Sequence, residues 1–355
     1  MSAAPASVAP ASIAFDRVRQ AADPRAVSLF EDALVWDMTL PWGAPWANYE
    51  TVLPRFAGAG IGAITLTVQN LPGADLRTAV TYVAKVRAEV ARRAGRMRIC
   101  TTVAGIRQAR ADGVLALILQ HQDGTPLGAM PEMVEAYHAL GIRCMLPVYN
   151  GKNMLGDGCA ERTDEGLTRL GQQVVREMLR VGVMADATHV GVRSSLDMAE
   201  LCAAAGKPLM ITHSNMHAVY PHYRNVTDEQ VRAAAATGGV VGINGLGEFL
   251  PDTDAGSEAM FRHLDHLVTL AGPRHAGLGL DFLDDPARFW ASVRAEAFRW
   301  PPLPFGRERV DTRFAGPEQA LELCDMMVRR GWPDEAVRGV LGENFLRAAG
   351  ESWGG

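Results

Sequence analysis

The chain has 355 residues, of which 48% are hydrophobic and 21% are charged, and its formal net charge is -5. This balance is ordinary for a soluble globular protein and provides no positive surface for nucleic acid or an anionic membrane. The five cysteines are scattered and form no CxxC pair, which excludes a disulfide framework and a zinc knuckle. We therefore expect a cytoplasmic protein with reduced thiols, whose partners are small molecules or other protein chains.

The N-terminal segment differs in composition from the rest of the chain. Its first twelve residues, MSAAPASVAPAS, lack the basic start and the continuous apolar core of a secretory signal. No window approaches the roughly 18 uninterrupted apolar residues of a membrane span. We expect residues 1–28 to form a loose tail and lead-in, and residues 29–355 to form one domain.

Short apolar runs alternate with amphipathic segments along the chain. The intervening segments, such as GLTRLGQQVVREMLRVG, carry apolar residues at helical spacing, and several end in glycine. Alternation without a break in composition favours a parallel sheet closed as a TIM-type (β/α)8 barrel. Nine runs compete for eight strand positions, and their pattern leaves open which one is extra. The runs are residues 33–39, 62–69, 97–103, 113–122, 142–149, 182–189, 208–213, 238–244 and 276–281.

In such a barrel the catalytic groups lie at the carboxyl ends of the strands. No GxGxxG motif follows the first run, so a nucleotide cofactor has no support. A single buried histidine is more often structural than a ligand, but two that end successive strands, with an aspartate ending a later one, suit zinc, manganese or iron. The candidate site residues are Asp37, Gln122, Tyr149, His189, His213 and Asp281.

A loop after His213 holds a further candidate, Arg224. The loop reads THSNMHAVYPHYRNVTDEQ and precedes a predicted helix. Two interpretations fit these residues: a solvated loop that leads into a helix N-cap, or a loop whose arginine binds a carboxylate through its planar fork. Spacing alone leaves both open.

Several long segments carry a specific resemblance. They are GLTRLGQQVVREMLRVGVMADATHVG, PLMITHSNMHAVYPHYRNVTDEQV, FRHLDHLVTLAG followed by GLGLDF, and RRGWPDEAVRGVLGENFLR. In these segments and in their order, the chain from about residue 29 to 349 resembles the renal (membrane) dipeptidase family of zinc peptidases, which are amidohydrolase-type (β/α)8 barrels. The resemblance implies a metal-dependent hydrolase that tends to form homodimers.

The resemblance also assigns roles to individual residues. By position, His189 and His213 match the two histidines that bind the second metal, and Arg224 matches the arginine that holds the substrate carboxylate. Asp281 matches the aspartate beside the metal-bound water. The implied reaction is attack of metal-bound hydroxide on a peptide carbonyl, with Asp281 moving a proton to the leaving amine.

Three positions depart from the family pattern. Where the family has His-x-Asp at the end of the first strand, VWDMTLPW places Asp37 and Thr39. Gln122 stands at the position of the glutamate that bridges both metals, and a neutral amide is a poor bridge. Tyr149 replaces a histidine thought to steady the tetrahedral intermediate. The chain is therefore expected to be a divergent, bacterial-type member that binds one zinc ion more readily than two.

These departures leave three functions open. The first is a hydrolase of a dipeptide or similar small amide that bears a carboxylate. Its metal would be held by His189 and His213 with Asp37 or Asp281, and Gln122 is a further candidate ligand. Tyr149 would either hydrogen-bond the oxyanion or pack its ring. The second function is different chemistry at the altered site, such as a C–N lyase or a specialised amidohydrolase, and the third is a catalytically inactive ligand-binding barrel.

The segment that follows Asp281 is rich in proline and aromatic residues. It reads FLDDPARFWASVRAEAFRWPPLPFGRERVDTRF and should lie over the mouth of the barrel. It is either a long surface loop or a lid that shapes the substrate pocket, with Trp290 and Trp300 as candidate apolar walls. We favour the lid because the loops after barrel strands usually set specificity.

Overall fold

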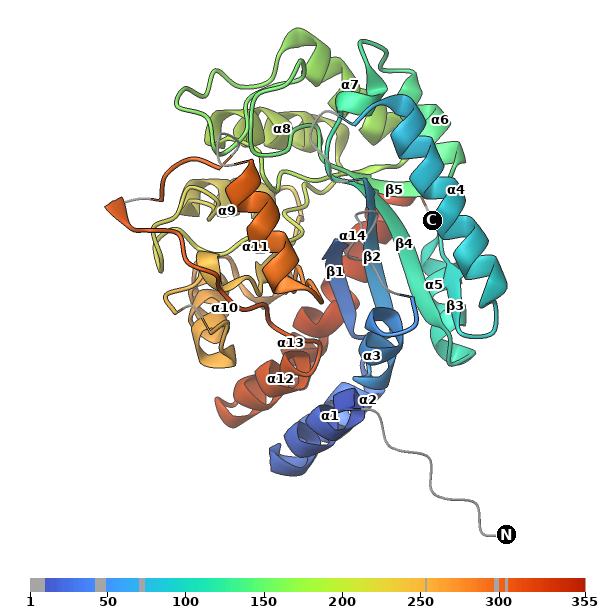
Figure 1. Ribbon diagram of the computed structural model, residues 1–355, viewed down its shortest axis with the longest axis vertical. Helices are drawn as coiled ribbons and strands as arrows, with labels where there is room; N and C mark the ends of the chain where they lie inside the picture. The colour runs from blue at the N-terminus through green and yellow to red at the C-terminus, as the bar shows by residue number, and fades with distance from the viewer. Residues whose placement is uncertain are drawn as a thin grey trace.

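The computed structural model describes residues 10–41, 49–69, 74–252, 254–296, 300–303 and 306–354. Its eight strands form one parallel sheet in the order β6-β5-β4-β2-β1-β8-β7, with β3 paired to β4 off this path (Figure 1). Their bounds are β1 Trp36–Pro41, β2 Ala63–Gln69, β3 Met97–Ile99, β4 Leu115–His121, β5 Ile142–Met145, β6 Met184–Ala185, β7 Val241–Asn244 and β8 Ala276–Gly279.

The two outer strands of this path, β6 and β7, are joined by the predicted run at 208–213. Met210 forms a parallel bridge with Asp186 at the end of β6, and Ile211 forms one with Val241 in β7. Together with the seven strands of the path, this run provides the eight strand positions of a closed barrel. The structure thus confirms the predicted α/β barrel.

The extra run among the nine predicted strands is the one that contains β3. This short strand pairs with residues 115–117, at the start of β4, whereas β5 pairs with the later residues 119–121 on β4. The two strands therefore share β4, and β3 occupies the part that β5 does not reach.

Helices cover the outside of the sheet, so β1 and β4 are buried along their whole length, as is usual for parallel strands. Local signals set the ends of several helices: Thr168 and Thr227 are N-caps, and Gly182 ends its helix in a left-handed conformation. The helices are α1 Pro10–Ala21, α2 Pro24–Asp32, α3 Val52–Gly58, α4 Leu76–Arg92, α5 Val103–Ala111, α6 Met133–Ala139, α7 Arg169–Val181, α8 Val192–Ala205, α9 Asp228–Ala236, α10 Ser257–Ala271, α11 Pro286–Ala295, α12 Gln319–Arg329, α13 Asp334–Arg338 and α14 Asn344–Trp353.

Shorter helical turns complete the fold, namely η1 Thr125–Leu127, η2 Gly247–Phe249, η3 Pro273–His275 and the π-type turn η6 Gly339–Glu343. None of the described helices has both the length and the apolar character that a bilayer crossing requires.

The last helix, α14, covers the end of the barrel at which the strands begin. Phe345 packs against Trp36, with ring centroids 6.2 Å apart, in a cluster that also contains Ala63 and Ala116 from the starts of β2 and β4. A Cβ atom at Gly277 would lie 2.3 Å from the Phe345 ring, so the glycine is needed for this close approach. The closed end leaves the carboxyl ends of the strands as the place for a cavity.

The N-terminal region differs from the expected loose lead-in over residues 1–28. Residues 10–21 form α1 and residues 24–32 form α2, whose N-cap is Asp23 and whose first residue is a proline. Phe30 on α2 is buried and contacts the Phe15 ring of α1. The Ala/Pro-rich composition concealed these amphipathic helices, and residues 1–9 lie outside the described part of the chain.

We predict that Phe30→Ala lowers the free energy of unfolding by about 3–5 kcal/mol, because Phe30 is only 2% exposed and its loss leaves a cavity in the core. Val310→Ala is the control, since this side chain is 52% exposed and should change stability by less than about 0.5 kcal/mol. Chemical denaturation would measure both variants. A loss below about 1 kcal/mol for Phe30→Ala would mean that α2 does not unfold together with the barrel.

Candidate active site

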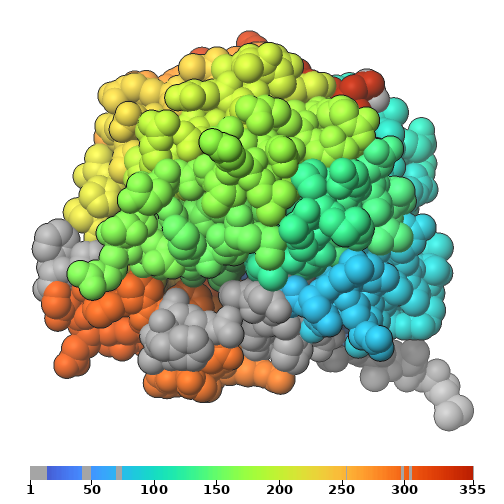
Figure 2. All heavy atoms as spheres, turned by 90° about the horizontal axis from the view of Figure 1, so that it is seen from above, coloured from blue at the N-terminus to red at the C-terminus, as the bar shows by residue number. Residues whose placement is uncertain are grey.

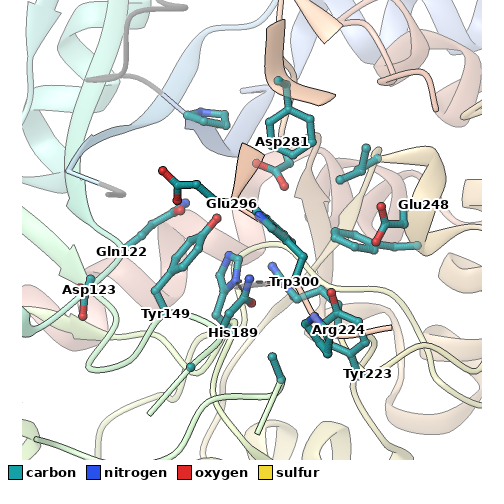
Figure 3. A pocket seen from close by; sticks show the side chains of 18 of the residues that line it. Gln122, Asp123, Tyr149, His189, Tyr223, Arg224, Glu248, Asp281, Glu296 and Trp300 are labelled. Carbon is teal, nitrogen blue, oxygen red and sulfur yellow. Dashed lines mark hydrogen bonds between the residues drawn. The ribbon is translucent and has the colours of Figure 1, made fainter. Parts of the chain in front are cut away.

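A cavity of about 600 Å³ opens at the carboxyl ends of the strands (Figure 3). Its lining comes from the last residue of β1 and from the segments after β4, β5, β6, the 208–213 run, β7 and β8. The segment after β8 includes the lid segment, defined here as the described part of residues 282–314. Figure 2 shows the orange lid segment beside the green surface of the segment that follows β5, and both segments line the cavity. Five of the predicted site residues line it: Gln122, Tyr149, His189, Arg224 and Asp281.

Backbone strain is concentrated around this cavity. Asn150, His189 and Asp281 adopt positive φ angles of 55°, 67° and 56°, a region that non-glycine residues rarely occupy. All three lie just after a strand and line the cavity. Such conformations cost free energy and persist where the surroundings enforce them, as they do at functional sites.

His189 and His213 meet beneath the cavity, with their Nε2 atoms 3.1 Å apart. The Nδ1 atom of His213 lies 2.8 Å from the Thr212 hydroxyl and 2.9 Å from the Thr39 hydroxyl. Each hydroxyl donates its own proton elsewhere, that of Thr212 to Asp186 and that of Thr39 to the Met38 carbonyl. Both therefore accept from His213 Nδ1–H, which leaves a lone pair on His213 Nε2.

The threonine at position 212 is itself fixed by Asp186, a residue that sequence reasoning missed. The fully buried carboxylate of Asp186 accepts hydrogen bonds from the hydroxyls of Thr188 and Thr212 and from the Gln120 amide. Burial raises the pKa of Asp186, and the hydrogen bonds from Thr212 and Thr188 oppose the shift. The available signal was an aspartate inside an otherwise apolar run, GVMADATH.

Both histidines are held neutral. Burial lowers the pKa of His189 and His213 well below the usual range, and the nearby charge of Arg224 lowers both further. The ring of Tyr149 stacks on His189, with centroids 4.0 Å apart and an angle of 25° between the planes. Burial also raises the pKa of Tyr149, so its hydroxyl keeps its proton at neutral pH and can donate a hydrogen bond.

Asp281 supplies the cavity with a carboxylate. Its Oδ2 atom accepts a hydrogen bond of 3.1 Å from the Asn244 amide. Burial raises the pKa of Asp281, while Arg224 and the Asn244 hydrogen bond act in the opposite direction. A carboxyl group with a raised pKa in a cavity is suited to accept and return a proton.

Arg224 places a positive charge at the cavity without a matching carboxylate. Arg224 is only 3% exposed. Its guanidinium donates to His189 Nδ1, Ser214 Oγ and the His213 carbonyl. Among the described residues, no carboxylate lies within the 4.0 Å of an ion pair with Arg224. Three contacts leave two of the five N–H groups for a ligand, so the arginine can bind an anion.

The sequence also matches a known family. The model of the membrane dipeptidases, peptidase family M19, matches residues 45–291, which is more than half of the chain. The chain belongs to this family. As a member of the membrane dipeptidase family, the protein is a metal-dependent hydrolase, and the predicted resemblance is confirmed.

Individual relatives agree with this assignment. An uncharacterized protein encoded in the pqqA 5' region of Klebsiella pneumoniae is 32% identical over 224 residues, which are 60% of this chain and 82% of that protein. The crystal structure of dipeptidase AC, a metallopeptidase of family M19, is 25% identical with a TM-score of 0.74, covering 91% of this chain and 99% of that one. An amidohydrolase from Pseudomonas aeruginosa shares the fold, with a TM-score of 0.83 at 24% identity, over 93% of this chain and 99% of that one.

Asp37 and Gln122, the two candidate ligands expected to depart from the family pattern, bond to other groups in the structure. The carboxylate of Asp37 lies between β1 and β8, where its Oδ1 accepts from the backbone N–H groups of Leu280 and Thr39, at 2.8 and 3.2 Å. Its buried Oδ2 has no hydrogen-bond partner among the described residues. Gln122 donates to the Thr67 hydroxyl. Asp37 does not line the cavity, so the contacts that it makes here are those of a structural carboxylate.

The residues at the histidine pair fit one metal ion. Two imidazole nitrogens 3.1 Å apart match two ligands of a single zinc, whose Zn–N bonds are about 2.0–2.1 Å. As the structure stands, His189 Nδ1 accepts from Arg224 Nε–H. A metal on Nε2 would move the His189 proton to Nδ1, where Asn150 Oδ1 at 2.7 Å could accept it in place of the Arg224 contact. Among the described residues, no three or more His, Cys, Asp or Glu side chains cluster as a metal site. Among the residues that the structure describes, the pair thus contributes two histidine nitrogens that could hold a metal ion.

The two tryptophans predicted as apolar walls differ in whether they reach the cavity. Trp300 lines the cavity, whereas Trp290 is 2% exposed and does not. The indole N–H of Trp290 donates to the Thr312 carbonyl, and its ring packs behind Phe289. Trp290 faces inward because it lies on the buried side of α11, so it supports the wall that other rings form.

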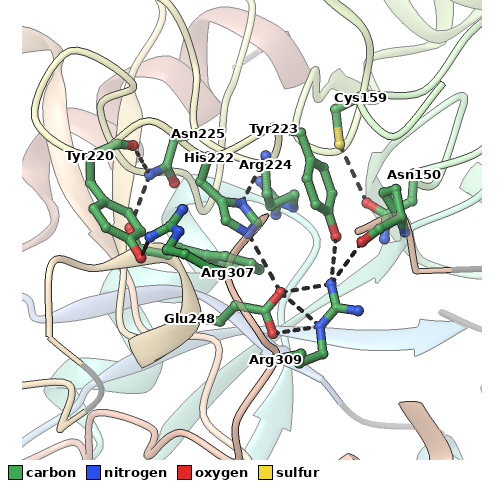
Figure 4. Close-up of polar contacts among 12 residues, drawn as sticks. Asn150, Cys159, Tyr220, His222, Tyr223, Arg224, Asn225, Glu248, Arg307 and Arg309 are labelled. Carbon is green, nitrogen blue, oxygen red and sulfur yellow. Dashed lines mark hydrogen bonds and ion pairs between the residues drawn. The ribbon is translucent and has the colours of Figure 1, made fainter. Parts of the chain in front are cut away.

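A buried ion pair attaches the lid segment to the barrel (Figure 4). Arg309 donates to both carboxylate oxygens of Glu248, each at 3.1 Å, and Glu248 also lies 3.5 Å from His222 Nε2. Burial would raise the pKa of Glu248, but the contacts with His222 and Arg309 outweigh it and lower the pKa. His222 in turn accepts a hydrogen bond from the backbone N–H of Arg224.

We predict that Arg309→Ala lowers the free energy of unfolding by roughly 3 kcal/mol, because it leaves the buried Glu248 charge without its partner. Arg19→Ala, which removes an exposed ion pair with Glu31, should change it by no more than about 1 kcal/mol. Adding Glu248→Gln to Arg309→Ala should restore part of the loss. Equal effects of the two single variants in chemical denaturation would contradict the role given to the Arg309–Glu248 pair.

A second prediction concerns pH. Burial raises the pKa of Asp37 from 3.8 to about 8, despite its backbone hydrogen bonds. The folded chain then holds more protons than the unfolded chain between these values, so this group lowers the free energy of unfolding by up to about 1.4 kcal/mol per pH unit as pH rises. In chelator-treated protein, Asp37→Asn should make the free energy of unfolding depend less on pH between pH 5 and 8. It should also raise the free energy of unfolding at pH 8. An unchanged slope would show that Asp37 is ionised, and Asp112→Asn on the surface is the control.

Proposed function

We propose that this protein hydrolyses a dipeptide or similar small amide that carries a carboxylate, using one metal ion held by His189 and His213. The observation that carries the proposal is the buried guanidinium of Arg224, which has no carboxylate partner among the described residues and lines the same cavity as His189 and Asp281. An uncompensated buried cation is costly, and a substrate carboxylate would offset that cost through the two remaining N–H groups.

The chain's own residues would divide the work around the scissile amide. A zinc ion bound to the histidine pair would polarise the carbonyl and lower the pKa of its water from about 15.7 to about 7. Asp281 would take a proton from the attacking water and return it to the leaving amine. The Tyr149 hydroxyl, which stays protonated, would donate a hydrogen bond to the developing oxyanion.

The position of Arg224 supports this arrangement. Its Nε atom lies 3.1 Å from His189 Nδ1, so a carboxylate on the guanidinium would be next to the histidine pair. A substrate in which one residue separates the carboxylate from the amide would therefore bring the amide to the same place as His189 and Asp281.

The number of metal ions is the first test. Protein purified without chelator and equilibrated with zinc should contain close to one zinc per chain by elemental mass spectrometry, and His213→Ala should contain much less. Two ions per chain would contradict the single-ion site and would mean that Asp37 and Gln122 act as ligands. Absence of metal would contradict the metal-dependent reaction.

The role of Arg224 is tested with matched substrates. Arg224→Gln should raise KM for a dipeptide by roughly 10- to 100-fold, because it removes charge-assisted hydrogen bonds to the carboxylate. The same dipeptide with an amidated C-terminus lacks that carboxylate, so its KM should change little. Zinc content of the variant should stay as in the parent, which separates substrate binding from loss of the metal. An equal effect on both substrates would overturn the assignment.

A further inference from the structure

The cavity is larger than two small residues need. Its volume of about 600 Å³ falls in the range of pockets that enclose drug-sized ligands. The reacting groups His189 and Asp281 share this lining with residues of the lid segment, among them Trp300 and Glu296 (Figure 3). The extra space must therefore be filled by a side chain of the substrate or by water.

The wall under the lid segment is aromatic. Phe289, Trp300 and Phe314 line the cavity and are all half-buried. Phe289 packs edge-on against Trp300 and Phe314, with ring centroids 6.1 and 5.5 Å apart. Water contacts such rings at a cost in free energy, whereas an apolar group of a ligand would remove that contact.

This wall is continuous with the carboxylate site. The three rings pack on a buried cluster of Leu246, Phe249, Trp290 and Val293. Phe249 also lines the cavity, and the Arg224 guanidinium lies over its ring at 5.4 Å from the centroid. The aromatic surface thus begins at the group that would hold the substrate carboxylate.

The wall is held in a fixed place. Arg309 ties the lid segment to Glu248 and lies 3.4 Å from the hydroxyl of Tyr223, the residue before Arg224. Its guanidinium also lies over the Trp300 ring, 5.9 Å from the centroid. Ion pair, hydrogen bond and ring contact together fix the aromatic wall beside the arginine, so the wall is part of the site.

The part of the lining that follows β4 and β5 is polar, and it includes Asp123, Asn153 and Glu161. These groups have partners, since Asn153 donates to Asp123 and Glu161 accepts from the Lys152 backbone N–H. A bulky apolar group placed there would displace water from polar side chains, which costs free energy. The aromatic wall is therefore the part of the lining that favours such a group.

We propose that the amino acid released from the amide carries both the carboxylate and a large aromatic or apolar side chain, which packs on Phe289, Trp300 and Phe314. This inference rests on the proposed function, because it assigns the carboxylate to Arg224 and the amide to the histidine pair. What it adds is that the bulky side chain belongs to the carboxylate-bearing half of the substrate.

Isomeric dipeptides provide the test. Gly-Phe and Phe-Gly have the same composition, and both enantiomers of phenylalanine would be used, with Gly-Gly as the reference. One enantiomer of Gly-Phe should exceed Gly-Gly in kcat/KM by roughly 100-fold, the effect of burying one aromatic side chain. Phe-Gly should stay within roughly 10-fold of Gly-Gly. An equal or larger preference for Phe-Gly, or no preference at all, would overturn the inference while leaving the hydrolase intact.

Variants connect the preference to the wall. Phe314→Ala should reduce the advantage of Gly-Phe over Gly-Gly by about 10-fold, and Phe314→Leu should retain most of it. Phe15→Ala, a half-buried ring on α1 outside the cavity lining, is the matched control and should leave the ratio unchanged. Because the ratio compares two substrates on one protein, a partly unfolded variant does not imitate the effect. An unchanged ratio in Phe314→Ala would contradict the placement.

Failure of the proposed function gives a different result. If the zinc-equilibrated protein hydrolyses none of the three dipeptides, the proposed reaction is overturned. Calorimetric titration with the same dipeptides then tests the pocket directly. Tighter binding of Gly-Phe than of Phe-Gly by about 10-fold or more would support the aromatic wall beside Arg224, and equal binding would overturn it.

Discussion

The buried carboxylate of Asp186 is the point on which the barrel and its site both depend. It receives hydrogen bonds from Gln120 on β4 and from Thr212, which follows the bridge that closes the barrel. A carboxylate removed from water requires such donors. By using the Thr212 proton, Asp186 makes that hydroxyl an acceptor for His213 and so fixes the imidazole with its lone pair toward His189. One side chain thereby connects three strand positions of the barrel and orients His213, a candidate metal ligand.

The charges around the histidine pair explain how this member differs from the family pattern. Gln122 is expected at the position of the family's bridging glutamate, and Asp37 Oδ1 accepts from two backbone N–H groups between β1 and β8. By the expected correspondence, Gln122 and Thr39 stand where the family has carboxylates, whereas Asp37 stands where it has a histidine, so the loss of negative charge falls at Gln122 and Thr39. At the same time, Arg224 is buried nearby without a carboxylate partner among the described residues. This balance of charge is the basis for the single metal ion and the anionic substrate proposed above.

The lid segment adds an aromatic wall to the cavity at the carboxyl ends of the strands. The strands place the reacting groups, while the segment after β8 contributes Phe289, Trp300 and Phe314 to the cavity. The Arg309–Glu248 ion pair and the Trp290 hydrogen bond to Thr312 keep this segment against the barrel. A surface loop can shape a site only if such contacts offset the entropy of ordering it.

The sequence by itself determined the alternation of strands and helices, the barrel, the family, and the residues at the strand ends that line the cavity. These follow from local patterns and from the rule that parallel strands bring their carboxyl ends together. Only the tertiary structure decided that β3 is the extra strand, that residues 10–21 and 24–32 form helices, and that Asp186 orients His213. It also decided that Asp37 lies within the β1–β8 ladder and that Trp300, not Trp290, faces the cavity. The direction of a side chain at a strand end or on a lid depends on register, bulges and neighbouring strands, and these contacts are distant in the sequence.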